Sequence, residues 1–567
     1  MKELNSQRVR ALAPENDPLK IGMGWTVEDL DKPQILVEST FGDSHPGSAH
    51  LDQFVEEAMR GITDAGARGA RYYTTDICDG IAQGHDGINY SLAHRDMIAN
   101  MIEIHGNSTG FDGGVFIASC DKSVPACLMG LARLDMPSIV ITGGVMDAGP
   151  DLLTLEQIGM YSAMCQRGEI TDEKLTYYKH HACPSCGACS FMGTASTMQI
   201  MAEALGLMLP GSALMPATCE DLKEMAYKAG KQVMELVKKG IKVSDIVTEK
   251  AFENAIMVHA AISGSTNSLL HIPAMAHELG IEIDADTFDR MHRGAHYLLD
   301  IRPAGYYAGG VPAVMEEIKS MLHLDVMTVT GKTLGENLED LKKNGFYDKC
   351  ESYLKKWGLK RTDVIRTFDE PIGTDGTVAI LRGNLAPEGS VVKHSAVPKE
   401  MFKAVLKARP FDCEEDAIAA VLSHKIQPGD AVFIRYEGPK GSGMPEMFYT
   451  TEAISSDPEL GKTIALITDG RFSGASKGPA IGHVSPEAAD GGPIALVEEG
   501  DLIRIDIPER VLEIVGIHGQ EMTKEEVDKV LAERRAAWKP KAPKYTKGVL
   551  KIYSEHAVSP MKGGYMV

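Results

Sequence analysis

The stretch GGVFIASCDKSVPACLMG (residues 113–130) decides the fold, because an apolar run there stops abruptly at polar residues. Residues 115–118 read as a buried strand, Cys120, Asp121 and Lys122 follow it, and small residues typical of a helix come next. In an open α/β sheet, ligands bind at the carboxyl ends of the strands, where loops lead into helices. We therefore expect this thiol, carboxylate and amine at such an edge of a sheet.

The same alternation of strand and helix extends from residue 30 to about residue 375. ARYYTTDI, GGVFIAS and PSIVITGG read as strands, whereas SLAHRDMIANMIEIHG and TASTMQIMAEALGLMLPG have the period of helices. This pattern predicts an α/β domain with a mostly parallel sheet over residues 1–375. Cys78 lies at another strand end, and Cys189 lies just before a helical run.

The pattern changes after about residue 375. GTVAILRGNLAPEGSVVK, PGDAVFIRYEG, GKTIALITDG and EEGDLIRIDIPERVLEIVG are short β-rich runs separated by Gly, Pro and Asp. We expect a second, β-rich domain over residues 376–567, built like a barrel or a sandwich. The charged segment 341–363 reads as an exposed helical connector between the two domains.

Composition limits the function classes. A chain of 567 residues favours two or more domains. Its net charge of −21 argues against a nucleic-acid or anionic-membrane partner, since both need a basic surface. The start of the chain lacks the apolar core of a signal peptide, and no run approaches the ~20 apolar residues of a membrane span. We expect a cytoplasmic protein whose ten cysteines are thiols or metal ligands rather than disulfides.

Three cysteines stand among turn-forming residues. Cys78 lies in TTDICDGIAQGHDG, Cys120 in ASCDKSVPA and Cys189 in CPSCGACSFMGTAS. Gly and Ser beside a thiolate let backbone N–H groups approach the sulfur, as an iron–sulfur cluster requires. A buried structural thiol is the alternative for each. CPSCGAC also has ferredoxin-like spacing, but a zinc site would need a second cysteine pair that the sequence does not provide.

A carboxylate directly follows two of these thiols: Asp79 follows Cys78, and Asp121 follows Cys120. Soft thiolates select iron–sulfur clusters and hard carboxylates select magnesium or manganese, so the two doublets suit two adjacent metal centres. Helix capping is the alternative for each Asp. Lys122, if desolvated near metals, can lose its proton and become a carbamylated, anionic ligand; a plain surface lysine is the alternative.

The segment ALITDGRFSGASKGPAIGHVSPEA carries the strongest pattern of the β-rich half. Small residues leave the Ser473 hydroxyl accessible, and Arg471 suits a substrate carboxylate. A glycine-rich turn with a solvated arginine is the alternative. EGPKGSGMPEM is either a mobile glycine loop or a lid that carries Glu446.

Three consecutive polar residues lie at the start of one further predicted helix. SGSTNSLLHIPAMAHELG places Ser265, Thr266 and Asn267 at the first turn of a helix. Residues of this kind either cap the helix or bind a substrate anion.

Together these blocks resemble the dihydroxyacid and sugar-acid dehydratases that carry iron–sulfur clusters. CDKSVPACLMG and ALITDGRFSGAS look like the two signatures of that family. CDGIAQGHDG, CGACSFMGTASTM, SGSTNSLLHIPA and GNLAPEGSVVK match further blocks in the same order. The resemblance covers about residues 22–516.

The resemblance implies a hydro-lyase that converts a 2,3-dihydroxy carboxylate into a 2-keto-3-deoxy acid. It further implies an iron–sulfur cluster, [4Fe–4S] in preference to [2Fe–2S], and a Mg²⁺ ion in a homodimer or homotetramer. The implied residues are Cys78, Cys120 and Cys189 for the cluster, Asp79, Asp121, carbamylated Lys122 and Glu446 for Mg²⁺, and Ser473 as the base. His50 aligns with a family histidine near the substrate; a helix-start histidine is the alternative.

One difference between this sequence and the family pattern bears on the identity of the substrate. The dihydroxyacid branch has a cysteine in a PCNxH-like motif, but this chain reads HPGSAH, with Gly47 at that position. Cys78 followed by Asp79 is instead similar to the 6-phosphogluconate and D-xylonate dehydratase branches. We therefore expect a sugar-acid dehydratase acting on an aldonate such as D-xylonate or D-gluconate. Dihydroxyacid dehydratase of branched-chain amino-acid biosynthesis and 6-phosphogluconate dehydratase are the alternatives, and a redox protein or a zinc hydrolase are alternatives of another class.

Overall fold

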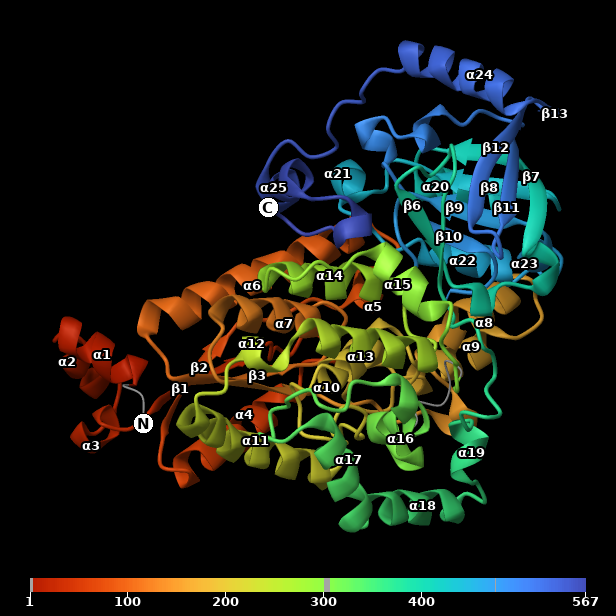
Figure 1. The fold of residues 1–567 in the computed structure, drawn as a ribbon. Helices are drawn as coiled ribbons and strands as arrows, with labels where there is room; N and C mark the ends of the chain where they lie inside the picture. The colour runs from red at the N-terminus through yellow and green to blue at the C-terminus, as the bar shows by residue number, and fades with distance from the viewer. Residues whose placement is uncertain (1–3, 300–305, 475) are drawn as a thin grey trace.

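Two β-sheets organise the chain in the computed structural model, which describes residues 4–299, 306–474 and 476–567 (Figure 1). The first sheet is made by strands between residues 34 and 142, and the second by strands between residues 379 and 521. This confirms the prediction of an α/β part with a parallel sheet followed by a β-rich, barrel-like part.

The first sheet has four parallel strands in the order β2-β1-β3-β4. The strands are β1 (Gln34–Ser39), β2 (Arg68–Tyr73), β3 (Gly113–Ala118) and β4 (Ser138–Thr142). Every residue of β1, β3 and β4 is buried, as expected for a parallel sheet covered on both faces. Figure 1 shows α6 (Tyr90–Thr109) and α7 (Ser123–Leu134) on one side and α4 (Leu51–Asp64) and α11 (Glu220–Lys239) on the other.

The strand order places a crevice between β1 and β3. The chain leaves β1 through α4 toward β2, and it leaves β3 through α7 toward β4 on the opposite side. Loops that diverge in this way leave room at the carboxyl ends of the two strands, where α/β proteins bind ligands. The loop after β3 carries Cys120, and the loop after β1 carries HPGSAH.

The second sheet has nine strands in the order β13-β12-β11-β7-β8-β9-β10-β6-β5. Four neighbouring strands, β7 to β10, are parallel, and the flanking pairs are antiparallel. The sheet curls until its ends meet, because Arg382 N–H donates to Arg510 O and Leu512 N–H donates to Arg382 O. The strands are β5 (Ala379–Leu381), β6 (Gly389–Val392), β7 (Lys403–Phe411), β8 (Asp430–Ile434), β9 (Ala465–Thr468), β10 (Ala480–Ser485), β11 (Leu502–Asp506), β12 (Val511–Ile517) and β13 (Gln520–Glu521).

Helices fill the space between and around the two sheets. The predicted helical character of segment 341–363 is confirmed, because it contains α18 (Phe346–Lys356) and α19 (Arg361–Val364). The helices that matter for the site are α5 (Asp79–Ala82), α8 (Ile158–Gln166), α10 (Thr194–Ala204), α14 (Ser268–Glu278), α21 (Pro439–Ser442) and α22 (Phe448–Ser455). In the described ranges, no helix combines the length and the apolarity needed to cross a bilayer.

The C-terminal tail joins the two halves. Helix α25 (Gly548–His556) packs against both α6 and α21, so it contacts the N-terminal and the β-rich part (Figure 1). Its Tyr553 is fully buried and donates a hydrogen bond to Gly564 O. The buried guanidinium of Arg95 on α6 donates to the carbonyls of Gly563 and Gly564. These contacts hold the β-rich part over the carboxyl edge of the first sheet.

Candidate active site

A pocket of about 320 Å³ lies where the two parts meet. The first sheet contributes the loops that precede α5 and follow β3, and the β-rich part contributes the loops before α22 and after β9. Seven of the predicted site residues line this pocket, and Thr194 lines it beside them: Cys78, Asp79, Cys120, Asp121, Cys189, Glu446 and Ser473. Blocks that are up to about 400 positions apart in the sequence therefore share one pocket.

Three carboxylates converge in the pocket. One oxygen each of Asp79, Asp121 and Glu446 lies within 4.8 Å of the others. Oxygen donors at this spacing suit a hard divalent cation such as Mg²⁺. The predicted Mg²⁺ ligands thus fit the ion by donor chemistry and by position.

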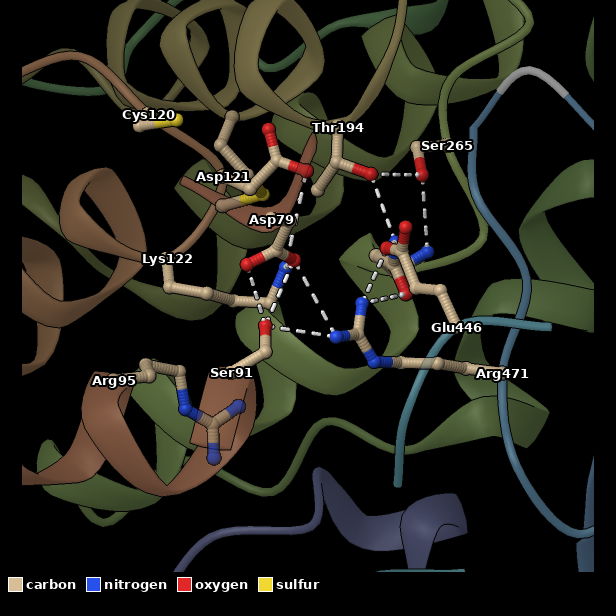
Figure 2. A network of polar contacts seen from close by, with 12 residues as sticks. Asp79, Ser91, Arg95, Cys120, Asp121, Lys122, Thr194, Ser265, Glu446 and Arg471 are labelled. Carbon is tan, nitrogen blue, oxygen red and sulfur yellow. Dashed lines mark hydrogen bonds and ion pairs between the residues drawn. The ribbon is translucent and has the colours of Figure 1, made fainter. Parts of the chain in front are cut away.

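Two buried cations hold these carboxylates in place (Figure 2). Lys122 Nζ lies 2.8 Å from Asp79 Oδ2 and 3.9 Å from Asp121 Oδ2, and its side chain is fully buried. Arg471 Nη2 lies 3.4 Å from Asp79 Oδ2, and Arg471 Nη1 pairs with Glu446 Oε1. Buried charges of one sign need such partners, because removing them from water is otherwise too unfavourable.

The surroundings of Asp79 and Asp121 give these two carboxyls different pKa values. Burial by itself would raise the pKa of Asp79, but the positive charges of Lys122 and Arg471 outweigh it and lower this pKa. Burial raises the pKa of Asp121 to about 7, with Lys122 opposing the rise and Asp79 and Glu446 adding to it. Asp79 is therefore anionic near neutral pH, and a bound cation would stabilise the anion of Asp121.

The thiols lie on the same side of the pocket. The sulfurs of Cys78 and Cys120 are within 4.8 Å of each other, and Cys189, just before α10, lines the same wall. The hydrogen bond from Cys120 lowers the pKa of Cys78 to about 6, although burial opposes this. The thiolate is the form that binds iron. The hydrogen bond between Cys78 and Cys120 therefore favours the metal-binding form of the Cys78 sulfur.

Ser473 follows β9 and is half-buried at the pocket wall. Its loop packs closely against the start of α10, since a Cβ atom on Gly474 would lie only 3.0 Å from Gly193 Cα. The glycine therefore lets the GRFSG segment approach the segment that carries Cys189. Thr266 lines a small cavity that Ser473 also borders, so it lies beside the predicted base rather than in the main pocket.

Ser265 and Asn267 lie behind the pocket wall. Asn267 Nδ2 donates to Glu446 Oε1 at 2.9 Å and to Thr194 Oγ1 at 2.8 Å. The hydroxyls of Ser265 and Thr194 are hydrogen-bonded at 2.8 Å. Both predicted residues are fully buried and outside the described wall of the pocket, so they position Glu446 and Thr194. Their predicted contact with substrate stays a prediction.

Arg471 and His50 are buried and hydrogen-bonded to other residues of the protein. Arg471 is fully buried, binds Glu446 and Asp79, and donates to Ser91 Oγ at 2.8 Å. His50 is buried, and its Nε2 donates to Gly143 O at 2.7 Å. Neither belongs to the described pocket wall, and their predicted contacts with substrate stay predictions.

The apolar part of the pocket wall could not be predicted from the sequence. Leu155, Ile158, Phe191 and Phe448 line the pocket, and Tyr449 stands at its exposed side. These residues come from ordinary turn and helix segments, among them α8 and α22, which carry no motif. The alternative zinc site also lacks support, since Cys183 and Cys186 join no group of three metal-ligand atoms within the described ranges.

Comparisons with known proteins match nearly the whole chain. The family model "Dihydroxy-acid/6-phosphogluconate dehydratase N-terminal" matches residues 32–337, and its C-terminal counterpart matches residues 363–564. A protein of Acetivibrio thermocellus named dihydroxy-acid dehydratase is 45% identical, over 96% of each chain. Proteins of Caldanaerobacter subterraneus (dihydroxy-acid dehydratase; 44%, over 96% of each chain) and Methanosarcina acetivorans (dihydroxy-acid dehydratase 1; 43%, over 97% of each chain) are similar.

These relatives correct one expectation. Gly47 and Cys78 led us to expect a sugar-acid dehydratase for an aldonate such as D-xylonate or D-gluconate, but the relatives are named dihydroxy-acid dehydratase. The expectation was wrong because both positions lie beside Cys120, on the thiol side of the site. A change there does not report on the substrate's side chain. The chain is a hydro-lyase and belongs to the dihydroxy-acid/6-phosphogluconate dehydratase family.

Proposed function

We propose that this chain removes water from a 2,3-dihydroxy carboxylic acid with a short apolar side chain and releases the corresponding 2-keto acid. The observation that carries the proposal is the convergence of Asp79, Asp121 and Glu446 in one pocket with Cys120 and Ser473. The names of the curated relatives support the same substrate class.

The apolar wall supports an apolar substituent at C3. Leu155, Ile158 and Phe448 offer no hydrogen-bonding side chain to a ligand in the pocket. A polyhydroxylated sugar chain packed against them would lose hydrogen bonds to water without replacement, which is unfavourable. A methyl or ethyl substituent instead gains about 0.8 kcal/mol for each CH₂ group that it buries.

Mg²⁺ and an iron–sulfur cluster are consistent with the family and fit the donors present. Asp79, Asp121 and Glu446 would hold Mg²⁺, with Lys122 as a fourth ligand after carbamylation. Cys120 and Cys189, with Cys78 beside them, would hold the cluster, for which we favour [4Fe–4S] over [2Fe–2S]. When bound, the two groups supply Lewis acids for the substrate's carboxylate and 2-hydroxyl and for its departing 3-hydroxyl.

The chain's own residues then supply position and proton transfer. Ser473 Oγ, as alkoxide, takes the proton from C2, and the electron pair of that C–H bond forms the C2–C3 double bond. The C3–O bond breaks, and the hydroxide that leaves is protonated to water. The resulting enol rearranges to the 2-keto acid, so the reaction is balanced without an oxidant. Arg471, which contacts both Asp79 and Glu446, keeps these two carboxylates oriented throughout.

The test is a substrate comparison with anaerobically purified protein that carries its cluster and Mg²⁺. Formation of 2-keto acid is measured with 2,3-dihydroxyisovalerate, D-xylonate and 6-phosphogluconate. We expect kcat/KM for the branched acid to exceed the other two by at least about tenfold, the discrimination that a hydrophobic pocket provides. A preference for either sugar acid contradicts the proposal.

A further inference from the structure

His45 lies beside two of the candidate thiols, although no sequence motif marks it. One of its ring nitrogens and the sulfurs of Cys78 and Cys120 all lie within 4.8 Å of one another. Donors bound to one tetrahedral metal at 2.0–2.3 Å stand about 3.3–3.8 Å apart. Small side-chain movements therefore suffice to bring the three atoms onto one metal.

A buried carboxylate orients the imidazole ring. His45 Nε2 lies 2.8 Å from Asp76 Oδ1, and both side chains are almost completely buried. Asp76 Oδ1 also accepts a hydrogen bond from Ser48 Oγ. A ring that donates Nε2–H to a carboxylate presents the lone pair of Nδ1, and metal-binding histidines commonly have this arrangement.

The other ring nitrogen has nothing to bind. His45 Nδ1 is buried and lacks a hydrogen-bond partner among the residues that the structure describes. An unsatisfied buried polar atom is unfavourable and calls for a missing partner such as an ion. The carboxylate on one side and the two thiols on the other indicate a metal rather than water.

Gly47 leaves the space in front of this nitrogen open. A Cβ atom on Gly47 would lie 3.0 Å from His45 Nδ1 and 3.4 Å from Cys120 Sγ. Any side chain at this position would enter the gap between the imidazole and the thiol. Gly47 thus keeps Nδ1 and Cys120 facing one common space.

We propose that His45 Nδ1 binds iron of the cluster, so that an imidazole joins Cys120 and Cys189 as a protein ligand. This assignment rests on the proposed function only in requiring a cluster at this site. Three protein ligands leave one position open for the substrate hydroxyl, so Cys78 is not needed as a ligand. His45 Nδ1 is a buried donor atom that has no hydrogen-bond partner within the described ranges.

Ligation of the cluster by an imidazole together with thiolates has a measurable consequence. An imidazole is neutral, so its replacement of a thiolate makes the cluster less negative and raises its reduction potential. A nitrogen bound to iron also gives a strong hyperfine coupling in the pulsed EPR spectrum of the reduced cluster. A hydrogen-bonded imidazole gives only a weak one.

The experiment uses the anaerobically purified full chain with its cluster reduced by dithionite. We expect a strong ¹⁴N coupling that changes to the ¹⁵N pattern when the protein is grown with ¹⁵N-labelled histidine. His45→Gln should lose this coupling and at least half of the bound iron. Cys78→Ser and His50→Gln, another buried histidine of the same loop, should retain the coupling.

A weak or absent coupling in the unsubstituted protein overturns the proposal, as does a His45→Gln protein that retains the strong coupling. The labelling experiment needs no variant, so a folding failure of His45→Gln leaves the test intact. Strong coupling in a protein that dehydrates no dihydroxy acid would refute the proposed function alone. Dehydration without the coupling would refute the His45 assignment alone.

Discussion

Lys122 Nζ lies 2.8 Å from Asp79 Oδ2, with the lysine side chain fully buried and the carboxylate nearly so. The lysine immediately precedes helix α7 beside the first sheet, and the aspartate starts α5 after another strand. Arg471 from the β-rich part approaches the same carboxylate oxygen at 3.4 Å. Asp79 is thus one of the points at which ion pairs join the two halves of the molecule.

Lys122→Met is expected to destabilise the protein and weaken its binding of Mg²⁺. Removing one partner of a buried pair leaves an uncompensated charge, which costs about 3 kcal/mol. Urea unfolding of the metal-free protein measures this loss. Lys179→Met, a lysine at the same pocket, is the control and should unfold like the unsubstituted protein. Equal midpoints for the two variants would refute the importance of the buried pair.

Ser473→Ala is expected to lower kcat by about 10²–10⁴-fold, the usual contribution of a general base. The iron content and visible absorbance of the cluster should not change, because Ser473 is not among its predicted ligands. Steady-state kinetics and metal analysis on the same sample separate the two effects. Ser476→Ala in the same loop is the control. A Ser473→Ala protein within tenfold of full activity would exclude this serine as the base.

Asn267→Ala is expected to weaken Mg²⁺ binding about 10–100-fold, because residues that orient metal ligands have effects of this size. The amide donates to Glu446 Oε1 at 2.9 Å, and its removal leaves that oxygen with Arg471 and frees the carboxylate to turn. Isothermal titration with Mg²⁺ measures the change. Asn254→Ala, which removes a buried asparagine that binds His323 instead, should leave the affinity unaltered.

Glu203 should make the protein less stable as the pH rises. Burial raises the pKa of this carboxyl to about 7, although the N–H groups of Gly211 and Ala213 donate to it and oppose the rise. The folded chain therefore holds a proton between about pH 4.5 and pH 7 that the unfolded chain has lost. Over this range the free energy of unfolding falls by up to about 3 kcal/mol.

The measurement for Glu203 compares urea unfolding at pH 5 and pH 8. Glu203→Gln should show a smaller difference between the two values than the unsubstituted protein, since the amide does not titrate. Glu235→Gln, on an exposed face of α11, should show the full difference. An unchanged pH difference in Glu203→Gln would show that other carboxyls cause it.

Much of the architecture could be predicted from local patterns. The strand predicted at residues 113–119 is β3, and the helical segment SLAHRDMIANMIEIHG is most of α6. Strand β7 was missed, because its basic residues mask the alternation of exposed and buried positions that the sheet imposes. Other short strands of the β-rich part could be predicted, because turn-forming residues separate them in the sequence.

The substrate was the least predictable property. The motifs around Cys120 and Ser473 predict the reaction class. They could be recognised in the sequence because a metal ligand or a base must be one particular residue type. The wall that meets the substrate's side chain needs only apolar bulk, which Leu155, Ile158 and Phe448 supply from segments without a motif. Their role depends on where α8 and α22 come to lie.

The sequence alone determined the reaction class and the order of the two parts along the chain. It also determined the adjacent thiol–carboxylate pairs, because residues that are neighbours in the chain stay close together in the fold. Only the tertiary structure decided that Arg471 and Asn267 brace Glu446 and that His45 faces Cys120 across Gly47. The physical reason is that these contacts join segments that are not neighbours in the sequence, and the strand order of the first sheet and the packing of the two parts bring them together.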